Sequence, residues 1–405
     1  MDNIATAIGR NPSFVSRAER GQVGMDVGIL FAIKKSMNIE NAPLFDYEIE
    51  TFKGRLYYWR ELIRNRRMDE AKNVQDELIV ILDMPFEQNL ISLYRMIEAR
   101  FLMTNHNFEA AGKILALYEA QLAEMDAESR FLYYHNWGSL GFYEKDFKKS
   151  LGFYLQSFDI LNENPSLSKD SGLLFNIAAC YSKLCLPLKA IRFAELACEV
   201  HTDEPTNILG SQIDNLLGGN YSSIGETKIA RHFFEKSLKK ARNINSELSI
   251  GMALHNLGLA NEREGKITEA KELYHEVLPY YQKHKDLLLG AHYRIIRCLI
   301  KENDFRQAKD MLEEIASQHT YNENQLILFK SLAHIMTLKD NASSNYIEKT
   351  TIPHLLNAND YFRALDYCEL LEAHYKKKGA IKKLLAVTEI LRDIYKHIIF
   401  GKGCD

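Results

Sequence analysis

Apolar residues recur along most of this 405-residue chain at the three- and four-residue spacing of amphipathic helices. The segments with this spacing are about 12–18 residues long, the usual length of helices in globular proteins. Gly and Asn separate them more often than Pro, of which the chain has only eight. No stretch alternates as a half-buried strand does. The pattern predicts an all-α protein.

The predicted helices pair into a repeat of about forty residues. A small side chain opens the second helix of each pair, and the steps between successive small residues are 40, 39, 40, 40, 40 and 38 residues. Small residues at fixed positions of two antiparallel helices are typical of tetratricopeptide units, although the common period is about 34 residues. The positions in question are Ala71, Ala111, Ser150, Ala190, Ala230, Ala270 and Ala308.

The repeat is expected to continue close to the C-terminus. After a less regular stretch near 320–357, a later helix pair is predicted at 360–377 with Ala364 in the same small-residue role, and 380–398 reads as a closing helix. Each pair can bury its apolar face only against its neighbours, so the units must stack. We therefore predict a tetratricopeptide-repeat right-handed superhelix over roughly 50–400.

The first helices of such a stack line a concave surface, and three of them have asparagine at the same position: Asn136, Asn176 and Asn256. Asparagine forms helices poorly, so its recurrence calls for a reason. A carboxamide can pair with both the N–H and the C=O of an extended peptide, which makes these residues candidate clamps for a peptide backbone. The alternative is that they bridge neighbouring helices.

Other side chains on the same helices complete the candidate groove. Arg294 and Arg297 could bind an acidic residue or the terminal carboxylate of a peptide through bidentate hydrogen bonds. For each single residue, packing or solvation is equally open. The candidate peptide-binding residues are Arg100, Asn136, Asn176, Asn215, His255, Asn256, Tyr293, Arg294 and Arg297.

The N-terminal segment has a different pattern. Residues 2–9 and 11–21 read as two short helices joined by a tight turn, with Ala5 as the small residue where they cross. Asn11 can cap the second helix, and Pro12 suits its first turn. A helix at 27–39 would pack behind them. We expect the outward side of the second helix to face a DNA major groove through Ser13, Phe14, Ser16, Arg17 and Arg20.

This segment resembles the repressor-type helix-turn-helix domain, whose reading helix often has the form SxxSxxExG. The matching residues are Ser13, Ser16, Glu19 and Gly21. That domain normally has a further amphipathic helix of about 15–20 residues before the segment seen here, whereas this sequence begins at Met1 without it. Either the recorded start is internal or the first helix is absent. In the second case we expect the apolar sides of Ile4, Ile8 and Val15 to lack a partner.

Charge and cysteine content limit which ligands and which cellular location we expect. The formal net charge is −3, and residues 1–45 hold five Lys/Arg against four Asp/Glu, a net of +1, so any DNA contact would be local. The six cysteines have no metal-ligand spacing, which favours reduced thiols and predicts no metal or cofactor. The sequence has no signal peptide and no apolar run of about 18 residues. We therefore expect a cytoplasmic protein without a membrane contact.

A helix-turn-helix domain at 1–45 followed by forty-residue tetratricopeptide units over 46–400 resembles the Rap–Rgg–NprR–PlcR–PrgX family of peptide-responsive quorum-sensing regulators, most closely its NprR branch. The resemblance implies a cytosolic receptor for a short imported signalling peptide, with Asn176 and Asn256 as the main backbone clamps. It also implies peptide-dependent transcriptional regulation by a homo-oligomer, a dimer or, with peptide, a tetramer.

The same resemblance implies a second activity. Rap proteins bind a phosphorylated response regulator through N-terminal helices, here 50–105, and a glutamine there promotes hydrolysis of the aspartyl phosphate. The segment 87–103 resembles the helix with that glutamine, and Gln88 is the matching residue. A carboxamide can orient an attacking water without acting as a base. The alternative for Gln88 is an ordinary helix residue without a catalytic role. The alternatives for the whole protein are a Rap-like phosphatase only, or a tetratricopeptide adaptor scaffold that binds protein tails.

Overall fold

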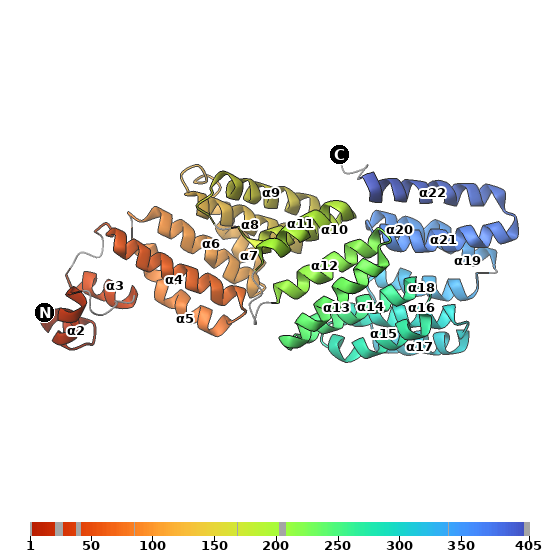
Figure 1. The fold of residues 1–405 in the computed structure, drawn as a ribbon, viewed down its shortest axis with the longest axis horizontal. Helices are drawn as coiled ribbons and strands as arrows, with labels where there is room; N and C mark the ends of the chain where they lie inside the picture. Colours follow the sequence, from red (N-terminus) through yellow and green to blue (C-terminus); the bar gives the residue numbers. More distant parts are fainter. Residues whose placement is uncertain are drawn as a thin grey trace. The chain divides into compact units, whose positions relative to one another are not determined.

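The computed structural model describes residues 2–20, 27–37, 42–84, 86–167, 169–201, 208–338 and 340–400 (Figure 1). The described residues are nearly all helical and contain no strand, which confirms the predicted all-α fold class. They form two compact units, Met1–Lys169 (unit 1) and Asp170–Asp405 (unit 2), and each is described by itself. Two residues singled out in the sequence, Gly21 and Cys404, lie outside the described residues.

Unit 1 begins with three short helices and continues with paired longer ones. Trp59 is fully buried and packs on Tyr94 and Phe101, with ring centroids 5.1 and 5.9 Å apart. The helices are α1 (Asp2–Ala7), α2 (Pro12–Glu19), α3 (Val27–Ser36), α4 (Asp46–Arg64), α5 (Met68–Leu78), the 3₁₀ helix η1 (Ile79–Asp83), α6 (Gln88–Thr104), α7 (Phe108–Leu117), α8 (Ala127–Tyr143) and α9 (Phe147–Glu163).

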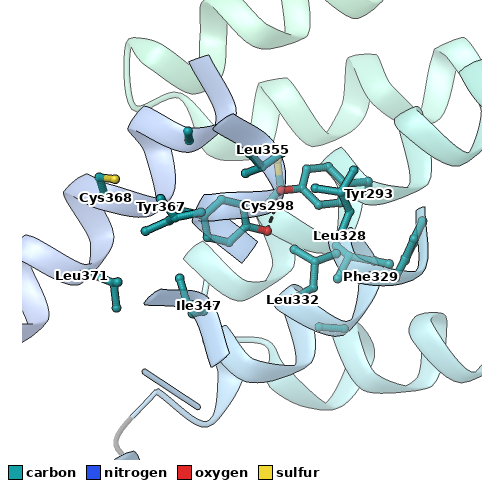
Figure 2. Packing of buried hydrophobic residues seen from close by; sticks show 14 of the residues in the cluster. Tyr293, Cys298, Leu328, Phe329, Leu332, Ile347, Leu355, Tyr367, Cys368 and Leu371 are labelled. Carbon is teal, nitrogen blue, oxygen red and sulfur yellow. Dashed lines mark hydrogen bonds between the residues drawn. The ribbon is translucent and has the colours of Figure 1, made fainter. Parts of the chain in front are cut away.

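Unit 2 continues the same alternation of helices. They are α10 (Ser171–Lys183), α11 (Pro187–Val200), α12 (Leu209–Ser223), α13 (Thr227–Asn243), α14 (Glu247–Arg263), α15 (Ile267–Tyr281), α16 (Lys285–Lys301), α17 (Phe305–Gln318), α18 (Glu323–Met336), α19 (Asn341–Tyr346), the π-helical turn η2 (Ile347–Thr351), α20 (Ile352–Asn357), α21 (Tyr361–Lys378) and α22 (Ile381–Phe400). Figure 2 shows part of its core, where α16, α18 and α21 pack together.

The predicted small residues mark the crossings of the helix pairs. Every one of them, Ala364 included, is 0% exposed and is the fourth residue of its helix. Ser150 is the one polar member, and its hydroxyl donates to the carbonyl oxygen of Gly138 on the facing helix at 2.6 Å. A fixed small side chain lets the two backbones approach closely, which is why the period was visible in the sequence.

Each helix pair turns through a residue in the left-handed region. At Cys185, for example, the φ angle is 56°, and the next N–H, of Leu186, donates to the carbonyl of Tyr181 at 2.9 Å. This closure satisfies carbonyl groups at the end of the first helix. Equivalent residues lie two positions before each second helix, at Arg66, His106, Lys145, Cys185, Gly225, Gly265, Asn303 and Asn359.

The C-terminal repeats differ from the prediction. The prediction of a helix pair at 360–377 was wrong, because α21 is one continuous helix over almost the same residues. The residue Asn359, with its positive φ, identifies α21 as a second helix. Its first helix is the continuous run α19–η2–α20, which the sequence showed only as a less regular stretch. The closing helix is confirmed as α22.

The N-terminal module has the predicted two-helix geometry. Gly9 turns the chain with a φ of 61°, and the Asn11 side chain accepts the N–H of Phe14 at 2.9 Å. Val15 is 4% exposed, so the expectation that it would lack a partner was wrong. The buried ion pair between Lys34 and Glu48, 3.2 Å long, joins α3 to α4.

Candidate functional site

Unit 2 contains a cavity of about 530 Å³ lined by residues of α12, α14, α16 and α21. The first three are the first helices of successive repeats, so stacking brings equivalent faces of them together. Charged side chains dominate the lining: the cations are Arg263, Arg294, Arg297, Lys301 and Arg363, and the acids are Glu262, Asp366 and Glu369. Two of the predicted groove residues, Arg294 and Arg297, are thus brought to one cavity.

Glu262 lies at the centre of this charge cluster, with its side chain 3% exposed. Lys301 Nζ is 2.7 Å from its carboxylate, and Arg294 Nη1 and Arg297 Nε are 3.4 and 3.5 Å away. Burial raises the pKa of Glu262, but these three cations outweigh burial and lower it to about 2. The carboxylate is therefore ionised and fixed in place.

Two contacts join α16 to α21 beside the cavity. Arg297 Nη1 donates to Asp366 Oδ2 at 2.7 Å. One helical turn earlier, the hydroxyls of Tyr293 and Tyr367 are 3.0 Å apart, as Figure 2 shows. Tyr293 is buried in the core, which corrects its predicted place on the groove surface.

The asparagines fall into two groups. Asn256 Nδ2 donates to Asn215 Oδ1 at 2.9 Å, so the two half-buried carboxamides lie together on the neighbouring inner helices α14 and α12. Asn176 is also half-buried, on α10. Asn136 is buried in unit 1 and donates to the carbonyl of Met96 at 2.7 Å. It therefore bridges α8 and α6. Bridging of neighbouring helices was the alternative to a peptide contact, and the Asn256–Asn215 bond also bridges two helices, α14 and α12.

Two other predicted groove residues, Arg100 and His255, contact neighbouring side chains of the protein. Arg100, in unit 1, donates to the Ser139 hydroxyl at 2.7 Å. His255 packs against the rings of Tyr274 and Tyr281. Burial, and then the charge of Arg294, lower the pKa of His255 to about 3, so its ring is neutral near pH 7.

Sequence reasoning missed the acidic members of the cavity and the contribution of α21. Lys301 could have been found, since it lies one turn after Arg297 on the same helix face. Asp366 and Arg363 gave no signal, because nothing in the sequence indicates that α21 packs beside α16 and α14. Glu262 lies on the first helix α14, but the sequence does not indicate that three cations of α16 surround it.

In unit 1, Gln88 is the first residue of α6 and is exposed. The preceding Glu87 accepts the N–H of Leu44 at 2.7 Å, which brings the start of α4 close to the start of α6. Exposed aromatic side chains are grouped here, namely Phe86 and the stacked pair Phe45 and Tyr47. An exposed apolar group beside a polar side chain is typical of a protein-binding surface.

On α2, the predicted DNA-facing residues are unequally exposed. Ser13, Arg17 and Arg20 are exposed, whereas Phe14 and Ser16 are half-buried. Arg20 donates to the carbonyl and the hydroxyl of Ser16 at 3.0 and 3.2 Å. Among the described residues, no group of His, Cys, Asp or Glu is arranged to hold a metal ion, and none of the described helices has the length and apolar character needed to span a membrane.

No protein-family model matches this sequence. The chain is 23% identical over 365 residues to response regulator aspartate phosphatase A of Bacillus subtilis (strain 168), a match that covers 85% of this chain and 94% of that protein.

Solved structures share the fold. A Rap protein in complex with competence and sporulation factor has a TM-score of 0.70, 17% identity and coverage of 86% of this chain and 99% of its own. The apo form of the quorum sensor NprR from B. thuringiensis has a TM-score of 0.70 and 19% identity, and the match covers 85% of this chain and 99% of NprR. NprR in complex with its cognate peptide NprX has a TM-score of 0.66 and 20% identity, again over 85% of this chain and 99% of its own. The resemblance to Rap and NprR proteins inferred from the sequence is confirmed.

Proposed function

We propose, on the basis of a fold shared with Rap and NprR, that this protein is a cytoplasmic quorum-sensing receptor. In this proposal a short imported signalling peptide binds in extended form along the inner helices of unit 2. The observation that carries the proposal is the cavity of about 530 Å³ on those helices, beside the paired carboxamides of Asn215 and Asn256. The neighbours bound to competence and sporulation factor and to NprX support it.

The carboxamides have unused capacity for a peptide backbone. Each offers two N–H donors and an oxygen with two lone pairs, and the Asn256–Asn215 bond uses one donor and one lone pair. That bond also orients both groups before a peptide arrives. Backbone pairing of this kind holds the peptide irrespective of its side chains, so selectivity must come from other parts of the groove.

The N-terminal module supplies the output in this proposal. Its capped helix α2 presents Ser13, Arg17 and Arg20 to solvent, as a reading helix requires for contacts with base edges and phosphates. Peptide binding would change the assembly of a homo-oligomer and thereby its ability to contact two half-sites of an operator. The protein then acts as a peptide-dependent transcriptional regulator.

Titration with heptapeptides from secreted precursors tests the proposal, with calorimetry for affinity and light scattering for assembly. We expect Asn256→Ala and Asn176→Ala each to weaken peptide binding by about 1–3 kcal/mol, because peptide polar groups lose partners. Asn243→Ala, at an exposed position of the outer helix α13, is the matched control. Unchanged affinity in both groove variants would remove the clamp. Peptide binding without any change of assembly would favour the adaptor scaffold instead.

A second activity, dephosphorylation or sequestration of a response regulator in the peptide-free state, is favoured by the surroundings of Gln88. Its carboxamide is exposed at the start of α6, beside the exposed aromatics Phe45, Tyr47 and Phe86. A partner docked on these rings would bring its phosphorylated residue near a group that can orient water. Similarity to a response regulator aspartate phosphatase supports this candidate.

We expect Gln88→Ala to slow response-regulator dephosphorylation by roughly tenfold or more, because the attacking water loses its orienting group. Peptide affinity should be unchanged, since the substitution lies in unit 1. The rate of phosphate release from a phosphorylated regulator measures the effect. Asn89→Ala removes the adjacent exposed carboxamide and serves as the control. A wild-type rate in the Gln88 variant would eliminate its catalytic role.

A further inference from the structure

We propose that the charged cavity of unit 2 is a carboxylate-binding subsite, and that the bound peptide places an acidic side chain or its C-terminal carboxylate there. This proposal rests on the proposed peptide-receptor function and adds which chemical group of the peptide binds in the cavity. Five cationic and three acidic side chains line the cavity, and one of the cations, Arg363, pairs with Asp360 outside the lining at 2.7 Å, so an excess of one cation remains. An ion-pair network that only stabilised the fold would need no such excess of cations.

The cations have more donors than the protein's own carboxylates can use. A guanidinium has five N–H donors in a planar fork that matches a carboxylate. Among the described residues, Glu262 is the acidic partner of Arg294, at 3.4 Å, and the same carboxylate is shared with Arg297 and Lys301. The side chains of Arg294 and Arg297 are each only 15% exposed, and both line the cavity. An anion that enters the cavity would meet these two guanidinium groups in its lining.

The two acids beside Arg297 differ in how firmly they are held. Glu262 is 3% exposed and surrounded by three cations, so it cannot leave its place. Asp366 is 37% exposed and, within the described residues, forms an ion pair with Arg297 alone. A ligand carboxylate at Arg294 and Arg297 would therefore compete with Asp366 rather than with Glu262. Asp366 occupies part of the subsite while the guest is absent.

This competition would link ligand binding to the packing of α21. The Arg297–Asp366 bond and the neighbouring Tyr293–Tyr367 hydroxyl pair join α16 to α21 (Figure 2). If Arg297 bonds to the ligand instead of Asp366, the Tyr293–Tyr367 pair still joins α21 to α16. The subsite is thus built so that an acidic ligand breaks one of the two side-chain hydrogen bonds described here between these helices.

A position-scanned heptapeptide library made in four forms tests the subsite. The forms combine a free or amidated C-terminus with Asp or Asn at the scanned position. We expect the amidated Asn form to bind at least about tenfold more weakly than the best carboxylate form, the effect of losing one charge-assisted pair. The two single-carboxylate forms show which source the cavity accepts. Equal binding of all four forms would overturn the subsite and leave the receptor intact, whereas no binding by any form would overturn both.

Three variants locate the effect. Arg294→Gln should bring the preference for carboxylate forms close to unity, while Arg306→Gln, an exposed arginine on α17, should leave it unchanged. Asp366→Asn should increase the affinity of carboxylate forms several-fold and leave the amidated Asn form unchanged, because the internal competitor is removed. A gain of affinity cannot result from misfolding. Equal or lower affinity for carboxylate forms in Asp366→Asn would contradict the proposed competition.

Discussion

Several glycines on the first helices of the repeats face aromatic rings at short range. A Cβ on Gly258 would lie 2.7 Å from Tyr274 Cε1, and one on Gly218 would lie 2.5 Å from the Phe234 ring. The ring in each case is fully buried on the second helix of the same unit. Because the ring cannot move outward without opening the helix pair, only glycine permits this packing.

We therefore expect Gly258→Ala to lower the free energy of unfolding by about 1–3 kcal/mol, the usual cost of overpacking a filled core. Gly290→Ala is the matched control, because it is also within a helix but a Cβ there meets nothing within 4 Å. That control should stabilise by about 0.5–1 kcal/mol through the higher helix propensity of alanine. Urea unfolding of both variants measures the difference. A Gly258 variant as stable as the control would mean that Tyr274 can be displaced at little cost.

At the scale of elements, the sequence predicts what depends on side-chain size and misses what depends on backbone conformation. The second helices were located through their buried small residues, which leave a regular period in the sequence. The left-handed turn residues left no such signal, because only Gly225 and Gly265 among the eight are glycine. The run α19–η2–α20 was missed for a related reason: a π-helical turn shifts the phase of its apolar positions.

The candidate site was predictable to the extent that it lies on repeated helices. Arg294 and Arg297 lie together in the cavity lining because the repeat fixes which face of α16 is inward, whereas their contact with a peptide stays a prediction. Tyr293 was placed wrongly, since the neighbouring residue on a helix points about 100° away and here meets Tyr367 of α21. Asp366 and Arg363 depend on long-range packing of α21, which periodicity does not describe.

At the scale of the whole molecule, stability depends on contacts between successive helices. In unit 2, one core cluster extends from Ala230 to Ala291 and another from Ala270 to Ile398, so the two overlap along the sequence at α15 and α16. In stacked repeats, such nearest-neighbour packing transmits the effect of a local change to the units on either side. Charge changes at α14 and α16 are therefore expected to affect the stability of unit 2 as a whole.

Two groups on α14, the helix before this overlap, are expected to make the stability of unit 2 depend on acid. The pKa of His255 is lowered to about 3 by burial and by Arg294, so between the usual pKa of about 6.5 and this value the unfolded chain binds more protons than the folded one. The neutral His255 ring makes its full contribution to the free energy of unfolding above pH 6.5, and this contribution is lost as the pH falls from 6.5 toward 3. Glu262, with its pKa lowered to about 2, adds stability that is present above about pH 4.5 and lost as the pH falls toward 2.

We therefore expect the free energy of unfolding to fall below pH 6.5, with His255 contributing a slope of up to about 1.4 kcal/mol per pH unit, the limit for one proton. His255→Gln should make the profile less steep between pH 6.5 and 4.5, because the imidazole at this position is removed. His275 and His292, whose pKa values burial also lowers, should keep their own part of the slope. Below pH 4.5 the Glu262 contribution should persist in this variant. His284→Gln, at an exposed position before α16, should keep the wild-type profile. Chemical unfolding measured from pH 7 to pH 4 decides the matter: a wild-type slope in His255→Gln would show that this ring does not control the acid response.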